Sequence, residues 1–219
     1  MNTKGKIIEL SIKLFNQFGF NSISLQEIAN NLNISRGNLT YHFKDKDFLL
    51  KKIIIQMWLE FEKEKQTSRV FPSFENLHNE IKIFYVLQNK YSFIFLDSQM
   101  SSHPIIKSKL IEMMQTSVEQ NKATILFSIQ LGNMKPEVIK GSYNNLAFSV
   151  WMISSFWLFQ QRILGDESIK DAEKMIWSLL LPFFTEKGIK SFKNFFGNKY
   201  FSNIGESFNY KIEQFTSKL

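Results

Sequence analysis

The stretch "SLQEIANNLNISRGNLTYHFKDKD", Ser24–Asp47, decides the fold of the N-terminal part of this 219-residue chain. Ser24 and Glu27 have the S-x-x-E spacing of a capping box, which predicts a helix that starts at Ser24. Ser35 is a second N-cap candidate, and it predicts another short helix. Two short helices separated by a few residues are typical of a helix-turn-helix unit.

The residues around this stretch complete the unit. Residues 5–18 place apolar side chains at helical spacing, Phe18 among them, and Gly19 follows as a C-cap would. Asn33 is suited to the positive φ that a tight turn between the two short helices needs. The second short helix is expected to end near Tyr41 or Phe43. The small core beneath it is expected to hold Phe15, Ile28, Leu39 and Phe43.

The Ser35 helix carries side chains that suit the major groove of DNA. Arg36 lies in its first turn and can reach guanine O6 and N7, and Asn38 can pair with adenine. Gly37 lowers helix stability by about 1 kcal/mol relative to alanine. Its missing side chain would let the backbone approach bases or phosphates closely. Thr40, one turn beyond Arg36, would contact a thymine methyl group.

The flanking residues suit the rim of the groove. Tyr41 and His42 can donate hydrogen bonds to phosphates. Lys46 lies near the start of the next helix, where the helix dipole adds to its charge, and Ser24 offers another helix N-terminus to a phosphate.

The charge of the chain is concentrated at the same end. Of a net charge of +7, residues 1–52 contribute eight Lys or Arg against four Asp or Glu, whereas residues 53–219 contain nineteen against sixteen. This density indicates an anionic partner for the N-terminal part. Cations that merely solvate helix surfaces explain the charge equally well. From capping and periodicity alone, DNA binding and a purely structural three-helix unit both remain open.

Residues 14–50 resemble the N-terminal domain of TetR-type transcriptional regulators. The residues that carry the resemblance are Phe15, Gly19, Phe20, Ser24, Ile28, Ala29, Ile34, Ser35, Gly37, Leu39, Tyr41, His42, Phe43, Lys44 and Lys46. Two positions depart from the family pattern: Thr40 stands where tyrosine is usual, and Ser11 where alanine is usual. The resemblance favours sequence-specific DNA binding over the structural alternative.

The rest of the chain reads as helices throughout, so we expect an all-α protein. Asp45 or Asp47 caps a long helix, and further helices are expected at 73–89, 91–101, 104–131, 136–164 and 168–187. Residues 188–219, rich in Phe, Tyr and Lys, are expected to form one or two short helices packed on the body. We assign residues 1–47 to a helix-turn-helix DNA-binding domain and residues 48–219 to a helical ligand-binding and dimerisation domain.

The resemblance implies that this second domain forms a homodimer, which would read a palindromic operator in double-stranded DNA. The helices at about 140–164 and 168–187 would form a four-helix bundle with their symmetry mates. Four side chains suit either that seam or the internal core: Trp151, Phe156, Trp177 and Leu181.

The resemblance also implies a small-molecule effector bound among the middle helices, and the few charges there favour an apolar or aromatic one. The candidate pocket residues are Met57, Met100, His103, Met113 and Trp151. Met and aromatic residues at this spacing are also ordinary core residues, and His103 also suits a helix end. The effector would swing the Asp47 helix and release a repressor from its operator.

The sequence argues against other classes of protein. It has no cysteine, no metal-ligand spacing, no phosphate loop and no nucleophile elbow, so we expect no metal, no cofactor and no enzymatic activity. The most apolar run, Leu146–Phe159, is too short to span a bilayer, and we expect a soluble, cytoplasmic protein. The rival hypothesis is a helical interaction or membrane-surface protein that acts through the basic, aromatic tail Lys190–Lys218.

Overall fold

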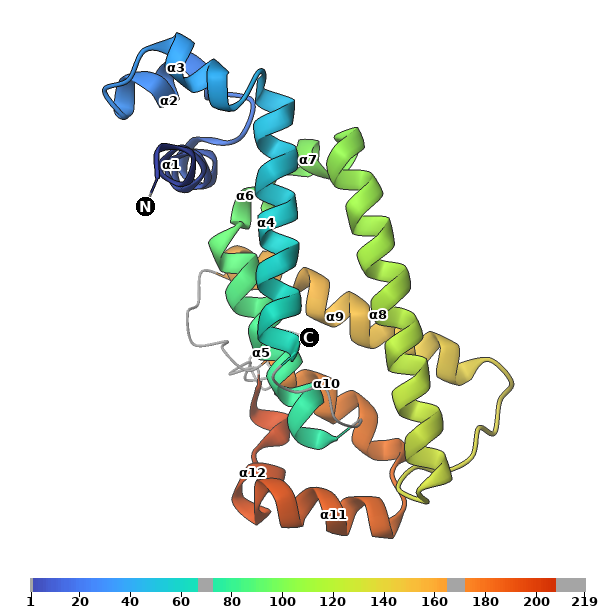
Figure 1. Cartoon of the computed structure of the whole chain (residues 1–219). Coiled ribbons are helices and arrows are strands. Elements are labelled where there is room, and N and C mark those ends of the chain that lie inside the picture. Colours follow the sequence, from blue (N-terminus) through green and yellow to red (C-terminus); the bar gives the residue numbers. More distant parts are fainter. Residues whose placement is uncertain (1, 67–72, 165–171, 208–219) are drawn as a thin grey trace, which may run out of the picture. The chain divides into compact units, whose positions relative to one another are not determined.

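The computed structural model describes residues 2–66, 73–164 and 172–207 (Figure 1). Its helices, in chain order, are α1 (Thr3–Phe18), α2 (Leu25–Asn31), α3 (Arg36–His42), α4 (Lys46–Gln66), α5 (Phe74–Lys90), α6 (Ser92–Leu96), α7 (Ser98–Ser102), α8 (Pro104–Gln130), α9 (Ser142–Leu164), α10 (Ala172–Leu180), the 3₁₀ helix η1 (Leu181–Phe183), α11 (Glu186–Phe196), α12 (Asn198–Ser202) and the 3₁₀ helix η2 (Ile204–Ser207).

The predicted all-α class is confirmed. Among the described residues the extended pairing is limited to one isolated bridge, between Met134 and Phe184. Over the same residues, no helix combines the length and the apolar character needed to cross a lipid bilayer.

The chain divides into two compact units. The first contains Met1–Arg69 and Ile83–Met113, and the second contains Val70–Lys82 and Met114–Leu219. Helices α5 and α8 therefore each contribute residues to both units. The helix-turn-helix residues lie wholly in the first unit.

In the first unit, α1 buries one face as its periodicity predicts. Ile7 and Phe15 are fully buried, and the small Ser11 is buried with them, its hydroxyl donating to the Ile7 carbonyl at 2.7 Å. Gly19 ends the helix as predicted, with a φ of 83° and its N–H donating to the Phe15 carbonyl at 2.9 Å. Phe18 departs from the prediction, because it lies on the exposed side of the helix.

Of the two predicted caps of helix α4, Asp45 and Asp47, the structure uses Asp45. The Asp45 carboxylate accepts a hydrogen bond from the Phe48 N–H at 2.6 Å, so Asp45 is the N-cap. Leu49, Leu50 and Ile53 are then fully buried in the core that also holds the helix-turn-helix side chains.

The prediction of one continuous helix at 91–101 is wrong, because the chain forms two short helices, α6 and α7, that are separated at Asp97. Asp97 has extended backbone angles, and its carboxylate accepts from the Gln99 N–H at 2.9 Å. An aspartate that caps a new helix ends the preceding one, even where apolar residues continue at helical spacing.

The two long helices predicted near the C-terminus are also shorter than expected. Helix α9 starts at Ser142 rather than at residue 136, because Glu137 folds back and accepts from the Tyr143 N–H at 2.8 Å. The helix predicted at 168–187 ends at Leu180, before Pro182, and Thr185 caps α11 by accepting from Gly188 N–H at 3.1 Å. Residues 165–171, where that helix was predicted to start, lie outside the described ranges.

Helix α11 packs tightly on the turn that follows α8. A Cβ at Gly188 would lie 2.0 Å from the Asn133 carbonyl oxygen, so only glycine fits there. Thr185 and Lys187 reinforce the contact: the Thr185 hydroxyl donates to the Gly132 carbonyl at 2.7 Å, and Lys187 Nζ donates to the Leu131 carbonyl at 2.6 Å. Of the tail predicted at 188–219, residues 208–219 lie outside the described ranges, and the remainder forms most of α11, α12 and η2.

Candidate nucleic-acid interface

Helices α2 and α3 form the predicted helix-turn-helix, and both predicted N-caps are present. The Ser24 hydroxyl accepts from the Glu27 N–H at 3.2 Å, while the Glu27 carboxylate accepts from the Ser24 N–H at 2.6 Å. Hydrogen bonding to Ser24, mainly to its backbone N–H, lowers the pKa of Glu27 and so favours the charged carboxylate in the capping box. Asn33 adopts the predicted positive φ, 54°, in the turn between the helices.

Helix α3 exposes its first turn and anchors itself to the core through Leu39. Ser35 accepts from the Asn38 N–H at 3.1 Å and caps the helix, and Arg36, Gly37 and Asn38 are exposed. Leu39 is fully buried beneath them. The predicted small core is confirmed, since its members are completely buried in one cluster: Phe15, Ile28, Leu39 and Phe43.

Gly37 has no steric reason for being a glycine within this fold. A Cβ placed on it would come no closer than 3.9 Å to a side chain, the Ser35 Oγ, and its φ is not positive. Alanine would therefore fit the folded chain and would favour the helix. The absent side chain leaves room outside the protein, at the surface that Arg36 and Asn38 share.

Thr40 directs its hydroxyl back to its own helix. Its Oγ1 lies 3.0 Å from the Arg36 carbonyl oxygen and 3.2 Å from that of Gly37. Because this donor is used internally, the methyl group is the part of Thr40 best suited to an outside partner. The contact of Thr40 with a thymine methyl group stays a prediction.

The end of α3 carries two polar aromatic side chains side by side, an exposed tyrosine and a half-buried histidine. Tyr41 is 85% exposed, and its ring packs edge-on against His42 at 5.2 Å between centroids. A tyrosine this exposed contributes little to the core. Its exposed hydroxyl is available to a phosphate, and the phosphate contacts of Tyr41 and His42 stay a prediction.

Lys46 is more enclosed than its predicted role suggests. Its Nζ lies 4.2 Å from the centre of the Phe20 ring. Burial lowers the pKa of Lys46, and the nearby negative charges of Asp47 and Glu27 only partly offset this effect. Lys44 is an exposed cation that is not among the predicted DNA contacts. Its side chain is 75% exposed, and its Nζ lies 3.8 Å from Asp45. It matches the family pattern, so the resemblance already contained the signal.

The predicted effector residues lie in separate surroundings. Met57, Met100 and Met113 are buried in the core of the first unit. His103 packs edge-on against Phe20, with 5.7 Å between ring centroids, and its Nε2 lies 3.4 Å from an Asp47 carboxylate oxygen. The remaining candidate, Trp151, lies on α9 in the second unit.

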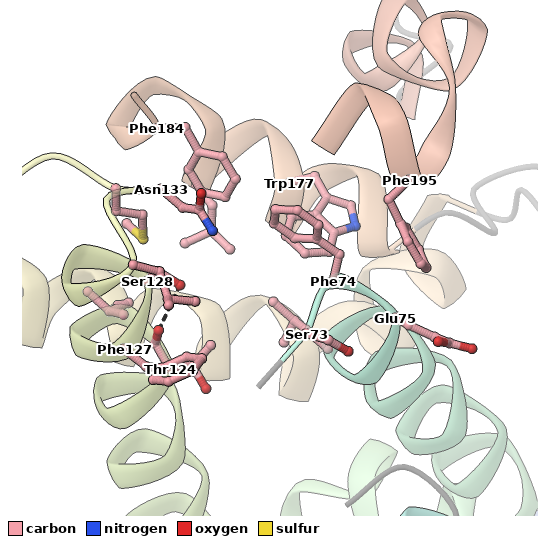
Figure 2. A pocket seen from close by; sticks show the side chains of 15 residues that line it. Ser73, Phe74, Glu75, Thr124, Phe127, Ser128, Asn133, Trp177, Phe184 and Phe195 are labelled. Carbon is pink, nitrogen blue, oxygen red and sulfur yellow. Dashed lines mark hydrogen bonds between the residues drawn. The ribbon is translucent and has the colours of Figure 1, made fainter. Parts of the chain in front are cut away.

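A cavity of about 210 Å³ opens elsewhere, within the second unit (Figure 2). It lies among the start of α5, the end of α8 with the turn that follows it, α10, the junction between η1 and α11, and α11 itself. None of the five predicted residues lines it. Its walls include Phe74, Ile125, Asn133, Trp177, Phe184 and Phe195. Sequence periodicity could not find it, because its walls come from five segments that only the tertiary fold brings together.

Metal-ligating side chains do not gather into a site in the part of the chain that the structure describes. Within those residues, the side chains exposed on α3 have no cluster of three or more His, Cys, Asp or Glu beside them. Their chemistry is that of a surface for hydrogen bonding to base edges and phosphates.

Two family models match the chain and together cover most of it. Residues 7–53 match the model described as bacterial regulatory proteins of the tetR family. Residues 56–192, more than half of the chain, match the model described as a bacterial transcriptional repressor.

Known proteins agree with these matches. The probable HTH-type transcriptional regulator YttP of Bacillus subtilis is 27% identical over 142 residues, which are 64% of this chain and 69% of that protein. A TetR-family transcriptional regulator from Marinobacter aquaeolei VT8 superposes with a TM-score of 0.77 at 19% identity, covering 94% of this chain and 99% of the other. SmeT in complex with triclosan superposes with a TM-score of 0.64 at 15% identity, covering 84% and 92%. The structural likenesses establish the fold.

Gly37→Ala is expected to separate stability from DNA binding. Because the added Cβ meets open space, the free energy of unfolding should rise by up to about 1 kcal/mol. Affinity for a selected DNA duplex should fall roughly tenfold, comparable to the loss of one base contact. Chemical denaturation and fluorescence anisotropy would measure the two effects.

The control is Gly205→Ala, because a Cβ there also meets open space and η2 lies in the second unit. Unchanged DNA affinity in Gly37→Ala would show that Gly37 is not a point of close approach.

Proposed function

The chain belongs to the TetR family of bacterial transcriptional regulators, and we propose that it represses its target genes by binding a palindromic operator as a homodimer until a small-molecule effector releases it. The family is non-enzymatic. We assign DNA recognition to residues 1–47, and effector binding and dimerisation to residues 48–219.

One observation carries the DNA-binding part of the proposal. Helix α3 presents Arg36, Gly37 and Asn38 on its exposed first turn, while Leu39 and Phe43 fix the opposite side in the core. Arg and Asn are the side chains that recognise guanine and adenine by paired hydrogen bonds in the major groove. A first turn inserted there places both against base edges, and Gly37 allows the backbone to follow.

An exposed apolar face supports the homodimer. Helix α9 buries one side, which includes Val150 and Leu158, and leaves large apolar side chains exposed on another. The exposed ones, which we call the α9 stripe, are Phe148, Met152, Phe156, Phe159 and Ile163. At 3.6 residues per turn these five lie within about 80° of one another around the helix. A continuous apolar stripe of this kind is typical of a protein–protein interface, and a second copy of the same stripe is its natural complement.

The first unit contains a direct link between α1 and the turn that joins α5 to α6. The Asn16 side chain donates to the Lys90 carbonyl at 2.9 Å and accepts from the Phe93 N–H at 3.0 Å. The Asn21 and Gln99 side chains are also hydrogen-bonded to each other. We propose that an effector changes the position of this turn, and that Asn16 passes the change to the helix-turn-helix. An effector can shift operator affinity only by as much as its own affinities for the two arrangements differ.

Sequence-specific binding is expected for duplexes enriched from a random-sequence pool. Arg36→Ala should weaken binding to the enriched duplex by about 1–3 kcal/mol and relax its sequence preference, because a bidentate contact to guanine is lost. Higher salt should weaken binding of the unsubstituted chain and of the variant alike. Fluorescence anisotropy at two salt concentrations measures both effects.

Lys199→Ala on α12 is the control, since it removes the same charge from an exposed residue of the second unit. Uniform weak binding to all duplexes, indifferent to Arg36, would contradict the proposal. Binding to anionic lipid vesicles without any DNA affinity would instead favour the rival membrane-surface protein.

Phe156→Glu is expected to dissociate the homodimer. Two symmetry-related charges in the α9 stripe should cost at least about 2 kcal/mol of association, the size of an interface hot spot. Sedimentation should then change from twice 25.8 kDa to the 25.8 kDa of one chain. Phe18→Glu is the matched control, because Phe18 on α1 is 51% exposed and Phe156 is 52% exposed. A dimer that survives Phe156→Glu but not Phe18→Glu would place the interface on another face.

Asn16→Ala is expected to uncouple the α5–α6 turn from DNA. Because linkage is reciprocal, operator binding should change amide hydrogen exchange in α6 and α7 of the unsubstituted chain. The variant loses both Asn16 hydrogen bonds, so most of that change should disappear, while operator affinity should fall less than in Arg36→Ala. Gln17→Ala, its exposed neighbour on α1, should behave like the unsubstituted chain. An identical exchange response in Asn16→Ala would rule out this link.

A further inference from the structure

The cavity of the second unit has walls that suit an aromatic ligand. Phe74 stands among five other rings: it stacks on Phe184 with 5.9 Å between centroids, meets Trp177 edge-on at 5.8 Å, and contacts Phe192, Phe195 and Phe196. Phe74, Trp177, Phe184 and Phe195 line the cavity (Figure 2). Aromatic walls favour a flat ring that can pack edge-on or offset against them.

The polar atoms around the cavity include the Ser128 and Thr124 hydroxyls and the buried Trp177 Nε1, for which no acceptor lies among the described residues. The Ser128 hydroxyl donates to the Thr124 carbonyl at 2.8 Å, as the dashed line in Figure 2 shows, and the Thr124 hydroxyl donates to the Gln120 carbonyl at 3.0 Å. Both hydroxyl protons are therefore used within α8. What these side chains can offer a ligand is the lone pairs of their oxygens.

Asn133 supplies the acceptor that lacks a partner. Its N–H donates to the Ser128 carbonyl at 2.9 Å, and its carbonyl accepts from the Thr185 N–H at 3.0 Å. The close packing of Gly188 on that carbonyl holds the turn in place. The side-chain Oδ1 is buried, and within the described residues nothing donates to it. A buried oxygen held in this way is satisfied by a donor that a ligand brings.

The volume and the lining of the cavity limit the size and the charge of the ligand that it can bind. A volume of about 210 Å³ exceeds the roughly 150 Å³ that accommodates benzene in an engineered apolar cavity. It suits one or two rings. The lining residues Ile125 and Leu180 are buried, whereas Glu75 and Phe195 are exposed. The buried apolar lining disfavours a charged ligand, because burying a charge without a partner is costly.

We infer that this cavity binds a compact, uncharged aromatic molecule of one or two rings that carries a hydroxyl or amine donor directed at Asn133 Oδ1. The inference deepens the proposed function and rests on it, because it names the place and the chemical class of the effector. Its test needs no DNA, so it can fail while operator binding stands.

The test titrates the full-length protein with three probes of the same ring size by isothermal calorimetry: 2-naphthol, 2-methylnaphthalene and 2-naphthoate. We expect 2-naphthol to bind about five- to tenfold more tightly than 2-methylnaphthalene, the effect of one hydrogen bond. We expect 2-naphthoate to bind more weakly than 2-naphthol. Asn133→Leu, which removes the acceptor at similar volume, should abolish the preference for the hydroxyl.

A pair of bulky substitutions locates the site. Leu131→Trp adds an indole at a residue that lines the cavity and is already partly exposed, so it should block 2-naphthol without unfolding the chain. Leu126→Trp is the matched control, since Leu126 is an exposed leucine of α8 that does not line the cavity. Circular dichroism checks the fold of each variant.

The outcomes are distinct. Binding of 2-naphthol that is lost in Leu131→Trp and kept in Leu126→Trp supports the inference. Binding that neither Leu131→Trp nor Asn133→Leu alters places the probe elsewhere and overturns it. Failure of all three probes to bind also overturns it. Operator binding, measured separately without probe, then decides whether the proposed function still holds.

Discussion

The burial of Leu39 and Phe43 is the constraint on which the DNA-binding surface depends. Both side chains are fully buried with Phe15 and Ile28, so α3 has one rotational setting on the small core. That setting leaves Arg36 and Asn38 exposed to solvent. A three-helix unit of this size has few apolar residues to spare, and each one therefore decides where the polar ones face. DNA recognition here follows from packing on the opposite side of the helix.

The same logic operates at the other end of the chain. The turn after α8 is fixed by its backbone, through Thr185 and the close packing of Gly188. Once the backbone of Asn133 is fully paired, its side chain is the group left to face the cavity. In α3 the buried side chains fix the helix, and the exposed ones are left to contact DNA. In the turn after α8 the backbone contacts fix the turn, and the Asn133 side chain is left to contact a ligand. Structural and binding roles are therefore carried by different atoms of the same segment.

The elements that the sequence predicted correctly are those set by adjacent residues. The capping box of Ser24, the cap of Ser35, the positive φ of Asn33 and the C-cap at Gly19 each depend on interactions within a few positions. The errors lie where apolar periodicity continued past a break. Asp97 and Thr185 cap new helices inside stretches that had been predicted as continuous, and Glu137 delays the start of α9. A capping side chain outweighs periodicity, because it satisfies backbone groups that periodicity ignores.

The sequence by itself determined the all-helical class, the helix-turn-helix and the residues that α3 offers to DNA, because caps, turns and helical spacing are local. Only the tertiary structure decided which apolar residues are core and which are surface. Trp177 is buried among aromatic rings, whereas Phe156 on α9 is exposed, although helical spacing alone allowed the same two roles for both. It also decided where a cavity lies, since that cavity is bounded by segments from residue 73 to residue 195. Contacts between residues this far apart in the chain leave no periodic trace in the sequence.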